Sequence, residues 1–555
     1  MPPPYAGAVT ATPVEDRSPA AEAAPWPPEG PRLSAIADRL WPAMPADRGR
    51  SWLVALGITL LGGLLRFWDL ATPRAVVFDE TYYMKDALSL LRFRYEKQFV
   101  DDANDLILNG NGNWQTIDVF KDAPAYVVHP PVGKWTIGIG EMVFGLTPFG
   151  WRVMMALLGT LMVLLVVRIT RRMTRSTLIG ALAGLFVAID GMAIVMSRTA
   201  LLDMTLAFWI VVAFGCLVMD RDRTRRILAE KVRAFPDDHT ALLTLRQGFG
   251  PRTGLRPWRW AAGLALGLAC ATKWSGVWFI VAFGLCTVIW DIGMRRVVGV
   301  RTSGAIGGAA VEGVLAFVAI AVVPVVVYVV SWSGWLLTDG GFYRDWAANN
   351  PASGVWALVP DNLRSLWYYH GQMLNFHRGL TSPHSYQSNA WSWFLQTRPT
   401  SFFYESPARG VNGCTVDKCS QEVVALGNPI IWWAATAAFL HQAWRWLTRR
   451  DWRSGVVVLA VLAAWLPWLG FQGRTIFTFY SVVMIPFLAM ALAMSLGTVL
   501  GRSDASPARR TVGAAAVGSV VLLAVAASWF FYPIWTGQVL PYDAWHLRMW
   551  FDTWV

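Results

Sequence analysis

The sequence predicts an all-α protein that crosses a membrane many times, and three observations lead to this fold class. Of the 555 residues, 55% are hydrophobic and only 15% are charged, which leaves too little polar surface for an ordinary water-soluble enzyme of this size. Apolar runs close to the length of a bilayer crossing recur between Ser51 and Tyr532. These runs lack the short alternating pattern of membrane β-strands, which excludes a β-barrel.

The first fifty residues predict a disordered cytoplasmic tail. They are rich in Pro and Ala. They lack the basic start and apolar core of a cleavable signal peptide, so none is expected. Within this tail, Leu33 to Leu40 has the pattern of a short surface helix. The first membrane span is expected to follow at about 52–68.

The basic residues set the expected orientation of the chain. The net charge is +12, but the basic residues cluster in short segments beside apolar spans, which indicates membrane topology rather than nucleic-acid binding. All five clusters are expected in the cytoplasm: Arg168 to Arg175, Asp220 to Arg226, Met294 to Arg296, Arg445 to Arg453 and Ser506 to Arg510.

Placing the five clusters on one side predicts a membrane domain at 51–532 with about eleven spans. The N-terminus is then inside, and an outer C-terminal tail covers 533–555. An apolar stretch from Gly133 to Gly145 is expected to lie on the membrane surface, because counting it as a span would place the first basic cluster outside. The remaining spans are expected near 152–170, 177–196, 200–219, 260–273, 275–292, 309–332, 429–447, 454–471, 476–499 and 511–532.

Two large outer loops are expected, at 69–150 and 333–427. Both are rich in Trp and Tyr, which suit the headgroup level of a membrane, and both carry unusual polar groups. We therefore expect the chemistry in these loops. The cytoplasmic stretch from Asp220 to Arg259 is expected to be a solvated helical connector without chemistry.

Two adjacent acids, Asp79 and Glu80, follow an apolar run and precede a helical pattern in the first outer loop. Acids at a helix start can simply cap the helix. Alternatively, adjacent carboxylates near lipid raise each other's pKa, and one of them could act as a general base.

A second motif contains His129, two prolines, Gly133 and Lys134. The prolines fix an extended turn before a helix start, where a backbone N–H and the Lys134 ammonium could bind an anion. The alternative is a rigid elbow before an interfacial helix, with Lys134 reaching toward water.

Several charged residues fall at the outer ends of the predicted spans, where the orientation rule does not favour cations. Several cations converging on one face suggest a pocket for a lipid-linked phosphate. Asp203 could instead form a structural ion pair with Arg198. The residues of this group are Arg152, Arg198, Asp203, Lys273 and Arg474.

The second outer loop contains histidines interleaved with aromatic and amide side chains, a composition suited to binding a sugar or a peptide. His370 and His377 are seven residues apart and could share a helical face, as a metal site would need, but ordinary hydrogen-bonding histidines are favoured. Tyr480 is interpreted as a membrane-interface aromatic or a pocket residue. The expected acceptor or sugar contacts are His370, His377, His384, Tyr386, Gln387, Trp391 and Tyr480.

Two of the five cysteines, Cys414 and Cys419, lie five apart in the same polar loop. If that loop is outside the cytoplasm, a local disulfide is the expected state. A zinc site is the alternative, but no second cysteine pair is adjacent to complete four ligands.

In this order along the chain, the motifs FDE, HPPVGKW, WRVMMALLG, SRTALLDMTL and TKWSG resemble those of the protein O-mannosyltransferases, in particular the actinobacterial ones. The resemblance covers nearly all of the membrane part. It implies the large membrane glycosyltransferase fold, of the GT-C type, with a long first outer loop and about eleven spans.

The resemblance also implies an activity, which is inverting transfer of mannose from a polyprenyl phosphate carrier to Ser or Thr hydroxyls of secreted proteins. Asp79 would be the base, Glu80 its companion in acceptor or sugar contacts, and Arg152 the residue needed for the donor phosphate. The remaining motif residues would shape the pocket: His129, Lys134, Arg198 and Asp203. Eukaryotic members insert a β-trefoil domain in the later loop, and 333–427 is too short to hold one.

With the expected orientation of the chain, the active site is predicted to lie at the outer face of the cytoplasmic membrane. A carboxylate accepts the hydroxyl proton, and cations stabilise the departing phosphate, so we expect no cofactor and no divalent metal. Membrane lipid, the lipid-linked donor and secreted acceptor proteins are the expected partners, the secretion channel is a further candidate, and nucleic acid is not. The alternatives are a transferase of the same architecture that modifies a lipid or glycan, and a transporter of lipid-linked sugars.

Overall fold

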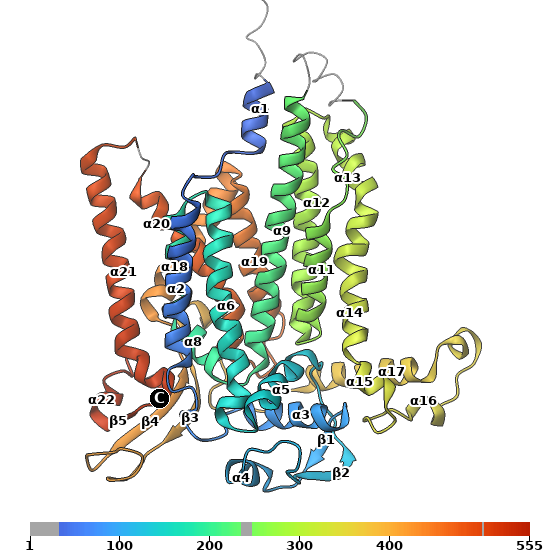
Figure 1. The fold of residues 1–555 in the computed structure, drawn as a ribbon, viewed down its shortest axis with the longest axis vertical. Coiled ribbons are helices and arrows are strands. Elements are labelled where there is room, and N and C mark those ends of the chain that lie inside the picture. The colour runs from blue at the N-terminus through green and yellow to red at the C-terminus, as the bar shows by residue number, and fades with distance from the viewer. Residues whose placement is uncertain (1–32, 235–246, 502–503) are drawn as a thin grey trace, which may run out of the picture.

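The computed structural model describes residues 33–234, 247–501 and 504–555. Most of the helices run side by side as a bundle, and the two large loops gather at one end of it, at the bottom of Figure 1. We call this the loop end. The opposite end, where α1 (Leu33–Leu40) lies, is called the basic end because the Arg-rich clusters of the sequence meet there.

The bundle contains a helix at every position where the sequence predicts a span. In chain order its helices are α2 (Arg48–Phe67), α6 (Pro148–Thr174), α7 (Thr177–Ile189), α8 (Gly191–Arg198), α9 (Leu202–Arg233), α11 (Pro257–Cys270), α12 (Val277–Val297), α13 (Thr302–Phe317), α14 (Val323–Ser331), α18 (Pro429–Arg449), α19 (Trp452–Leu469), α20 (Ile485–Leu500) and α21 (Pro507–Thr536). A π-helical turn, Val318–Val322, joins α13 to α14.

The predicted count of eleven spans is larger than length and composition support. Among the described residues, eight helical segments are long and apolar enough to cross a membrane, or nine if the bent pair α7 and α8 is one span. The two other predicted spans correspond to α11, which has only 14 residues, and to α18, whose apolar run is interrupted by His441, Gln442 and Arg445.

The first large loop forms α3 (Glu80–Phe93), β1 (Lys97–Phe99), α4 (Ala103–Leu108), β2 (Phe120–Pro124) and α5 (Val132–Phe144). The strands β1 and β2 pair antiparallel. Both α3 and α5 lie across the end of the bundle rather than along it (Figure 1). The helix predicted on the membrane surface near Gly133 is therefore present as α5.

The second large loop and the C-terminal segment build one structure at the loop end. The loop contains α15 (Ser333–Leu337), α16 (Trp346–Asn349), η3 (Gly354–Leu358), α17 (Asp361–Gly379), η4 (Ala390–Leu395), β3 (Thr400–Glu405) and β4 (Cys419–Ala425). The C-terminal segment adds β5 (Val539–Pro541), α22 (Tyr542–His546) and η6 (Asp552–Trp554). Because β4 pairs with both β3 and β5, the predicted C-terminal tail contributes a strand, β5, to the same sheet.

Ion pairs join the Arg-rich clusters at the basic end. Nε of Arg172, at the end of α6, donates to Asp222 of α9 over 2.8 Å. The predicted connector 220–259 is less solvated than expected, because Asp220 is buried and pairs with Arg256. Residues 235–246 of that connector lie outside the described residues, as do residues 1–32 of the predicted tail. Ile36 and Leu40 of α1 pack against Leu228 of α9.

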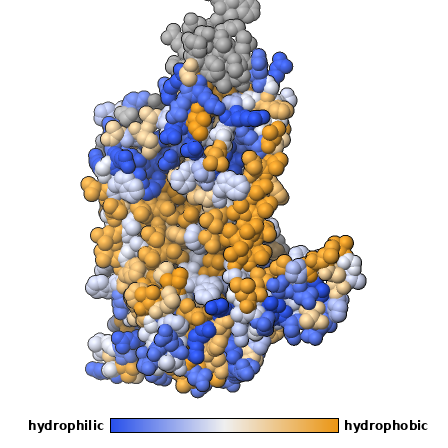
Figure 2. Space-filling view, turned by 45° about the vertical axis from the view of Figure 1, so that its right-hand side comes forward, coloured by the Kyte–Doolittle hydropathy of each residue, from blue (hydrophilic) through white to orange (hydrophobic). Residues whose placement is uncertain are grey.

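On the face shown in Figure 2, an apolar belt crosses the middle of the bundle between two hydrophilic ends. Large side chains of the belt point outward, such as Leu60 of α2 and Val314 of α13, which are 65% and 67% exposed. Exposure of this kind is stable only against hydrocarbon. The belt therefore places the bundle in a bilayer.

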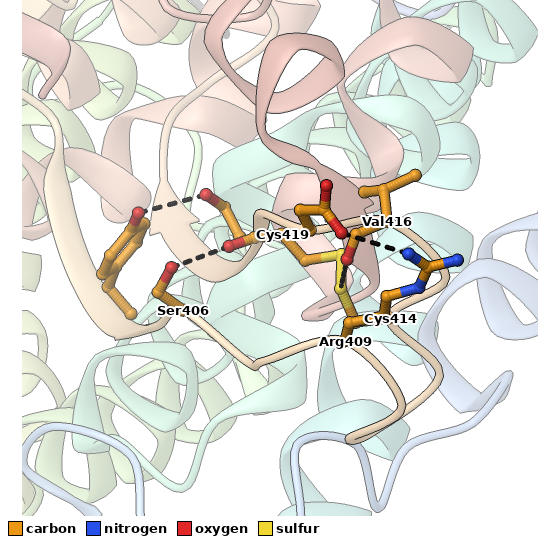
Figure 3. The surroundings of a disulfide bond; sticks show 8 residues. Ser406, Arg409, Cys414, Val416 and Cys419 are labelled. Atoms are coloured by element: carbon orange, nitrogen blue, oxygen red, sulfur yellow. Dashed lines mark hydrogen bonds and ion pairs between the residues drawn. A yellow bond between two sulfur atoms is a disulfide. The ribbon is translucent and has the colours of Figure 1, made fainter.

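The cysteine pair predicted in the second large loop is a disulfide (Figure 3). Cys414 and Cys419 close the turn between β3 and β4, and the Ser406 hydroxyl donates to the carbonyl oxygen of Cys419 over 2.8 Å. The bond thus fixes the hairpin of the loop-end sheet.

Candidate active site

A cavity of about 700 Å³ lies at the loop end and is walled by both large loops. We call it the main cavity. Asp79 and Tyr83 line it from the start of α3, His377 from α17 and Arg474 from the segment after α19. These residues are far apart in the sequence, so the cavity exists only because the two loops close on each other.

A second, more apolar cavity of about 300 Å³ adjoins the main cavity, and we call it the side groove. It runs between α12, α17 and the end of α19, and its apolar lining includes Trp274, Trp278, Trp468 and Phe471. Five residues line both cavities, and two of them are cations: His129, Lys273, His377, Arg474 and Tyr480. Two cations therefore lie where the main cavity meets the more apolar side groove.

Asp79 faces the main cavity with its carboxylate free. It occupies the N-cap position of α3 but makes no capping hydrogen bond. Among the described residues none donates a hydrogen bond to its oxygens. Burial raises the pKa of Asp79 to about 6, with Lys273 acting in the opposite direction and Asp203 adding to the increase. A partly buried carboxylate with an elevated pKa and free oxygens can accept a proton near neutral pH.

The residue before Asp79 explains how this carboxylate is aimed. Phe78 has a φ of 48°, in the left-handed region that a large side chain rarely adopts. Its ring stacks on Phe402 at 4.7 Å and meets Phe479 edge-on at 5.7 Å. These contacts hold a backbone conformation that would otherwise cost about 1–3 kcal/mol, and the turn directs Asp79 into the cavity. Such strain is invisible in the sequence.

Glu80, the neighbour of Asp79, is buried and bonds only to other groups of the protein. Its carboxylate is fully buried and pairs with Arg152 through two hydrogen bonds of 2.8 and 2.9 Å. It also accepts the backbone N–H groups of Val77 and Ala200, each over 2.9 Å. With all acceptor positions occupied, Glu80 is not available to an acceptor or a sugar.

The expectation that Arg152 binds a donor phosphate is not met by this geometry. Its guanidinium is fully buried, does not line either cavity, and donates to Glu80 and to the carbonyl oxygens of Leu70, Ala71, Pro73 and Ala75. Every N–H of the fork thus has a partner inside the protein. Arg152 thus holds the segment between α2 and α3 in place.

Arg198 likewise faces the backbone instead of the cavity. It donates to the carbonyl oxygens of Arg66, Trp68 and Asp69, at the C-terminal end of α2. A cation is favourable there because those carbonyls have no partner within the helix. The alternative pairing of Asp203 with Arg198 is also absent, because both Asp203 oxygens accept hydrogen bonds from Lys273, over 2.8 and 2.9 Å.

Lys273 and Arg474 are the cations that face both cavities. The ammonium of Lys273 lies 4.5 Å from the centre of the Tyr480 ring in addition to its pair with Asp203. The Arg474 guanidinium lies over Trp468 at 5.7 Å and contacts His377 over 3.3 Å, and its buried Nε has no partner among the described residues. Arg474 therefore retains hydrogen-bonding capacity for an anion.

Lys134 lines the main cavity with its charge already balanced. It contacts Asp86 at 3.1 Å and Glu96 at 2.8 Å. Burial opposes the charge, but the two carboxylates outweigh burial and raise the pKa of Lys134. The start of α5 is not an open anion site either, because a Cβ on Gly133 would lie 2.7 Å from Leu202.

The histidines divide into two groups. His129 and His377 line both cavities with their rings 5.3 Å apart. Burial lowers the pKa of His129 well below its usual range and that of His377 to about 4, so both are neutral at pH 7. His377 donates Nε2–H to the Val128 carbonyl oxygen over 2.9 Å, which leaves Nδ1 to accept from Arg474.

Other predicted contacts lie outside the cavities. His370 bonds Tyr328 over 2.6 Å and the Leu366 carbonyl over 2.7 Å, as a structural side chain. Trp391 packs edge to face against Trp465. Like Tyr386 and Gln387, it does not line either cavity. His384 and Tyr480 do line the main cavity.

Sequence reasoning missed Tyr83 and Asp86, which line the main cavity next to Asp79. The three lie at positions i, i+4 and i+7 along α3 and therefore share one face of the helix. That spacing was visible in the sequence and could have indicated them.

Two family models match the chain. Residues 56–231 match the family described as dolichyl-phosphate-mannose-protein mannosyltransferase, and residues 362–554 match the C-terminal four TMM region of protein-O-mannosyltransferase. Together they cover most of the membrane part, including the first large loop and residues 362–427 of the second.

Similar proteins carry the corresponding names. A polyprenol-phosphate-mannose–protein mannosyltransferase of Mycobacterium tuberculosis is 37% identical over 522 residues, which is 92% of this chain and 93% of that protein. One from Corynebacterium glutamicum is 31% identical, over 90% of this chain and 91% of that protein. The fold is similar to a chain of the Saccharomyces cerevisiae Pmt1-Pmt2 complex bound to the sugar donor, with a TM-score of 0.67, 15% identity and 94% coverage of both chains.

Proposed function

The chain belongs to the protein O-mannosyltransferase family, and we propose that it transfers mannose from polyprenyl phosphate mannose to Ser or Thr hydroxyls of proteins. The observation that carries this proposal is the carboxylate of Asp79, which accepts no hydrogen bond from the described residues, in a cavity that shares two cations with an adjoining apolar groove. The base, the phosphate-binding cations and the lipid groove would then all border the main cavity, where the reaction takes place.

The side groove suits the donor lipid. Its residues Val277, Trp278 and Phe471 are each about 40% exposed, at 43%, 39% and 44%, so the groove opens on the surface of the bundle beside α12. A polyprenyl chain could lie there while its phosphate reaches Lys273 and Arg474 at the junction. The mannose would then extend into the main cavity, toward Asp79.

The reaction is a single displacement in this proposal. The acceptor hydroxyl oxygen bonds to C1 of mannose as the bond from C1 to the phosphate oxygen breaks, so the configuration at C1 inverts. Asp79 takes the hydroxyl proton, which typically contributes about 10²–10⁴ in rate. The phosphate leaves with the bonding electrons, and Lys273 and Arg474 stabilise its charge. These two cations make a divalent metal unnecessary.

We further propose that the loop end faces the exterior of the cytoplasmic membrane and the basic end the cytoplasm. The Arg-rich clusters meet at the basic end, as expected for cytoplasmic loops. The disulfide is at the loop end, and disulfides persist in oxidising compartments. Secreted polypeptides would then meet the cavity from outside, and the secretion channel stays a candidate partner.

The direct test uses the purified protein with polyprenyl phosphate mannose and a Thr-rich peptide. We expect mannose on the peptide, in the linkage opposite to that of the donor. Mannose on an added lipid or glycan instead would contradict the protein acceptor. Movement of the donor across vesicle membranes without any transfer would favour a transporter.

A further inference from the structure

Residues 338–379, which we call the lateral arm, extend sideways from the bundle at the loop end. The arm contains α16, η3 and α17 and lies at the lower right of Figure 1, next to the end of α14. None of its elements is a span. Its surface is therefore expected to be polar if it stands in water.

The tip of the arm is apolar instead. The ten residues from Pro351 to Pro360 contain no charged side chain. Within them Val355 is 80% exposed, Trp356 58% and Leu358 83%, and Leu358 is the most exposed large hydrophobic side chain among the described residues. Lipid-facing side chains of the spans are exposed to the same degree, such as Trp529 of α21 at 81%.

The apolar surface continues along α17. Leu363, Trp367 and Leu374 are spaced four and seven residues apart and so share one face of the helix, where they are 39%, 73% and 40% exposed. The buried face of α17 packs through Tyr369 and other side chains against the aromatic cluster around Trp332. The exposed face is thus a second apolar face of a helix that is already anchored.

The arm is held in place, so its exposed side chains are not the product of a loose loop. The Arg364 guanidinium donates to the carbonyl oxygens of Ala347 and Asn350, and the Ser365 hydroxyl accepts the Ala347 N–H. These bonds join α16 to α17. The apolar tip consequently has a defined direction.

That direction is toward the level of the apolar belt. In Figure 2 the hydrophobic surface of the arm lies mainly on its upper side, facing the level of the apolar belt, with hydrophilic surface below it. The lipid-facing side chains of α14, such as Val326 and Val330, and Leu337 at the end of α15 connect the belt to the arm. Tryptophans such as Trp356 and Trp367 are typical of the headgroup level.

We propose that the lateral arm is an interfacial anchor that rests its apolar face on the lipid surface at the loop end. Its occupant is membrane lipid, and the face continues the lipid-facing belt of the bundle. Through α17 the arm also carries His377 and Arg378, which line the side groove. Its contact with lipid would therefore be made by the same helix that forms one wall of the side groove. This inference does not depend on the proposed reaction.

The test places an environment-sensitive NBD label on the full-length protein in phosphatidylglycerol and phosphatidylcholine vesicles at high lipid excess. Val355→Cys and Leu358→Cys are labelled separately in a Cys216→Ala background, because Cys216 is half-buried whereas the two other free cysteines of the described chain, Cys270 and Cys286, are buried. The control is Asp122→Cys, on β2 and fully exposed.

We expect blue-shifted emission at 355 and 358, with an at least about twofold loss of emission when the vesicles contain nitroxide-labelled lipid, because interfacial faces insert ~5–10 Å. The control at 122 should show neither effect. Water-like emission at both arm positions would overturn the proposal. Blue-shifted emission without lipid quenching would also overturn it, since a second copy of the chain or another protein would then cover the arm.

Discussion

Two neighbouring regions of this protein contain similar charged residues and use them differently. In the cavity wall, no residue of the described chain bonds the Asp79 carboxylate oxygens or the Nε of Arg474. In the ion-pair cluster behind it, Glu80 and Arg152 satisfy each other and the surrounding backbone completely. Asp79 and Glu80 are adjacent in the sequence, so the difference teaches that unused hydrogen-bonding capacity, and not position in a motif, separates the proposed base from the carboxylate that supports the fold.

The sharpest test of this comparison removes the free carboxylate. Asp79→Ala is expected to lower mannosyl transfer by about 10²–10⁴, the usual contribution of a general base. Folding should persist because Asp79 makes no capping bond to α3. Transfer to a Thr-rich peptide and the thermal unfolding midpoint in detergent are measured together, with Asp79→Asn as the isosteric variant. Full activity in either variant would remove Asp79 as the base.

The cluster behind the wall should respond in the opposite way. Arg152→Ala leaves the buried Glu80 carboxylate without its charge partner, and breaking such a pair typically costs about 3–5 kcal/mol. We expect a large loss of stability, seen as a lower unfolding midpoint. The double variant Glu80→Gln with Arg152→Met should recover part of it, because no buried charge is then unpaired. A stable Arg152→Ala protein with only a raised KM for the donor would assign Arg152 to the phosphate after all.

The cations at the junction of the two cavities should affect donor use, and Lys273 should also affect folding, because its removal leaves the buried Asp203 carboxylate without its charge partner. Lys273→Met keeps the length of the side chain but removes the ammonium that faces the groove. Hydrogen bonds to charged groups contribute about 1.5–3 kcal/mol, which corresponds to a rise in the KM for the lipid donor of about ten- to a hundredfold. Asp203→Asn is the matched control, because it removes the partner of Lys273 and retains the cation. An unchanged KM in Lys273→Met would place the phosphate elsewhere.

The raised pKa of Asp79 predicts how activity depends on pH. The base must be deprotonated to act, so kcat/KM should fall as the pH decreases through about 6. At pH 5 the activity should be about tenfold below its plateau. His129 and His377 stay neutral across this range and should add no further ionisation. A profile that is flat between pH 5 and 7 would show that Asp79 does not limit the reaction.

The smallest expected effect is that of metal removal. If Lys273 and Arg474 stabilise the leaving phosphate, activity in excess EDTA should equal that in buffer with added Mg²⁺ or Mn²⁺. The transfer assay with metal-depleted protein measures this directly. Loss of activity with EDTA and recovery with one metal would mean that the phosphate needs a further cation.

Much of the architecture could be predicted before any coordinates. The positions of the helices follow from apolar runs and from the basic clusters between them, and the disulfide follows from two cysteines in one polar loop. The span count could not be settled this way, because α11 is short and α18 contains polar residues. The placement of the C-terminal segment in a sheet with β4 could not be predicted either, since strand pairing over more than a hundred residues leaves no local signal.

The candidate site was predicted in part. Asp79, Lys273, His377 and Arg474 line the main cavity, whereas Arg152 and Arg198 turn to backbone carbonyls. The sequence shows that a cation lies near the end of a span. It does not show whether that cation meets an open cavity or the carbonyls of a neighbouring segment, because both environments favour positive charge.

By itself the sequence determined a multispan membrane protein with its chemistry in two loops at one end, since hydrophobicity and charge act over short stretches of chain. Only the tertiary structure decided which polar side chains keep free hydrogen-bonding groups. That depends on partners from distant segments of the chain. The backbone N–H of Ala200, for example, donates to the Glu80 carboxylate and not to that of Asp79.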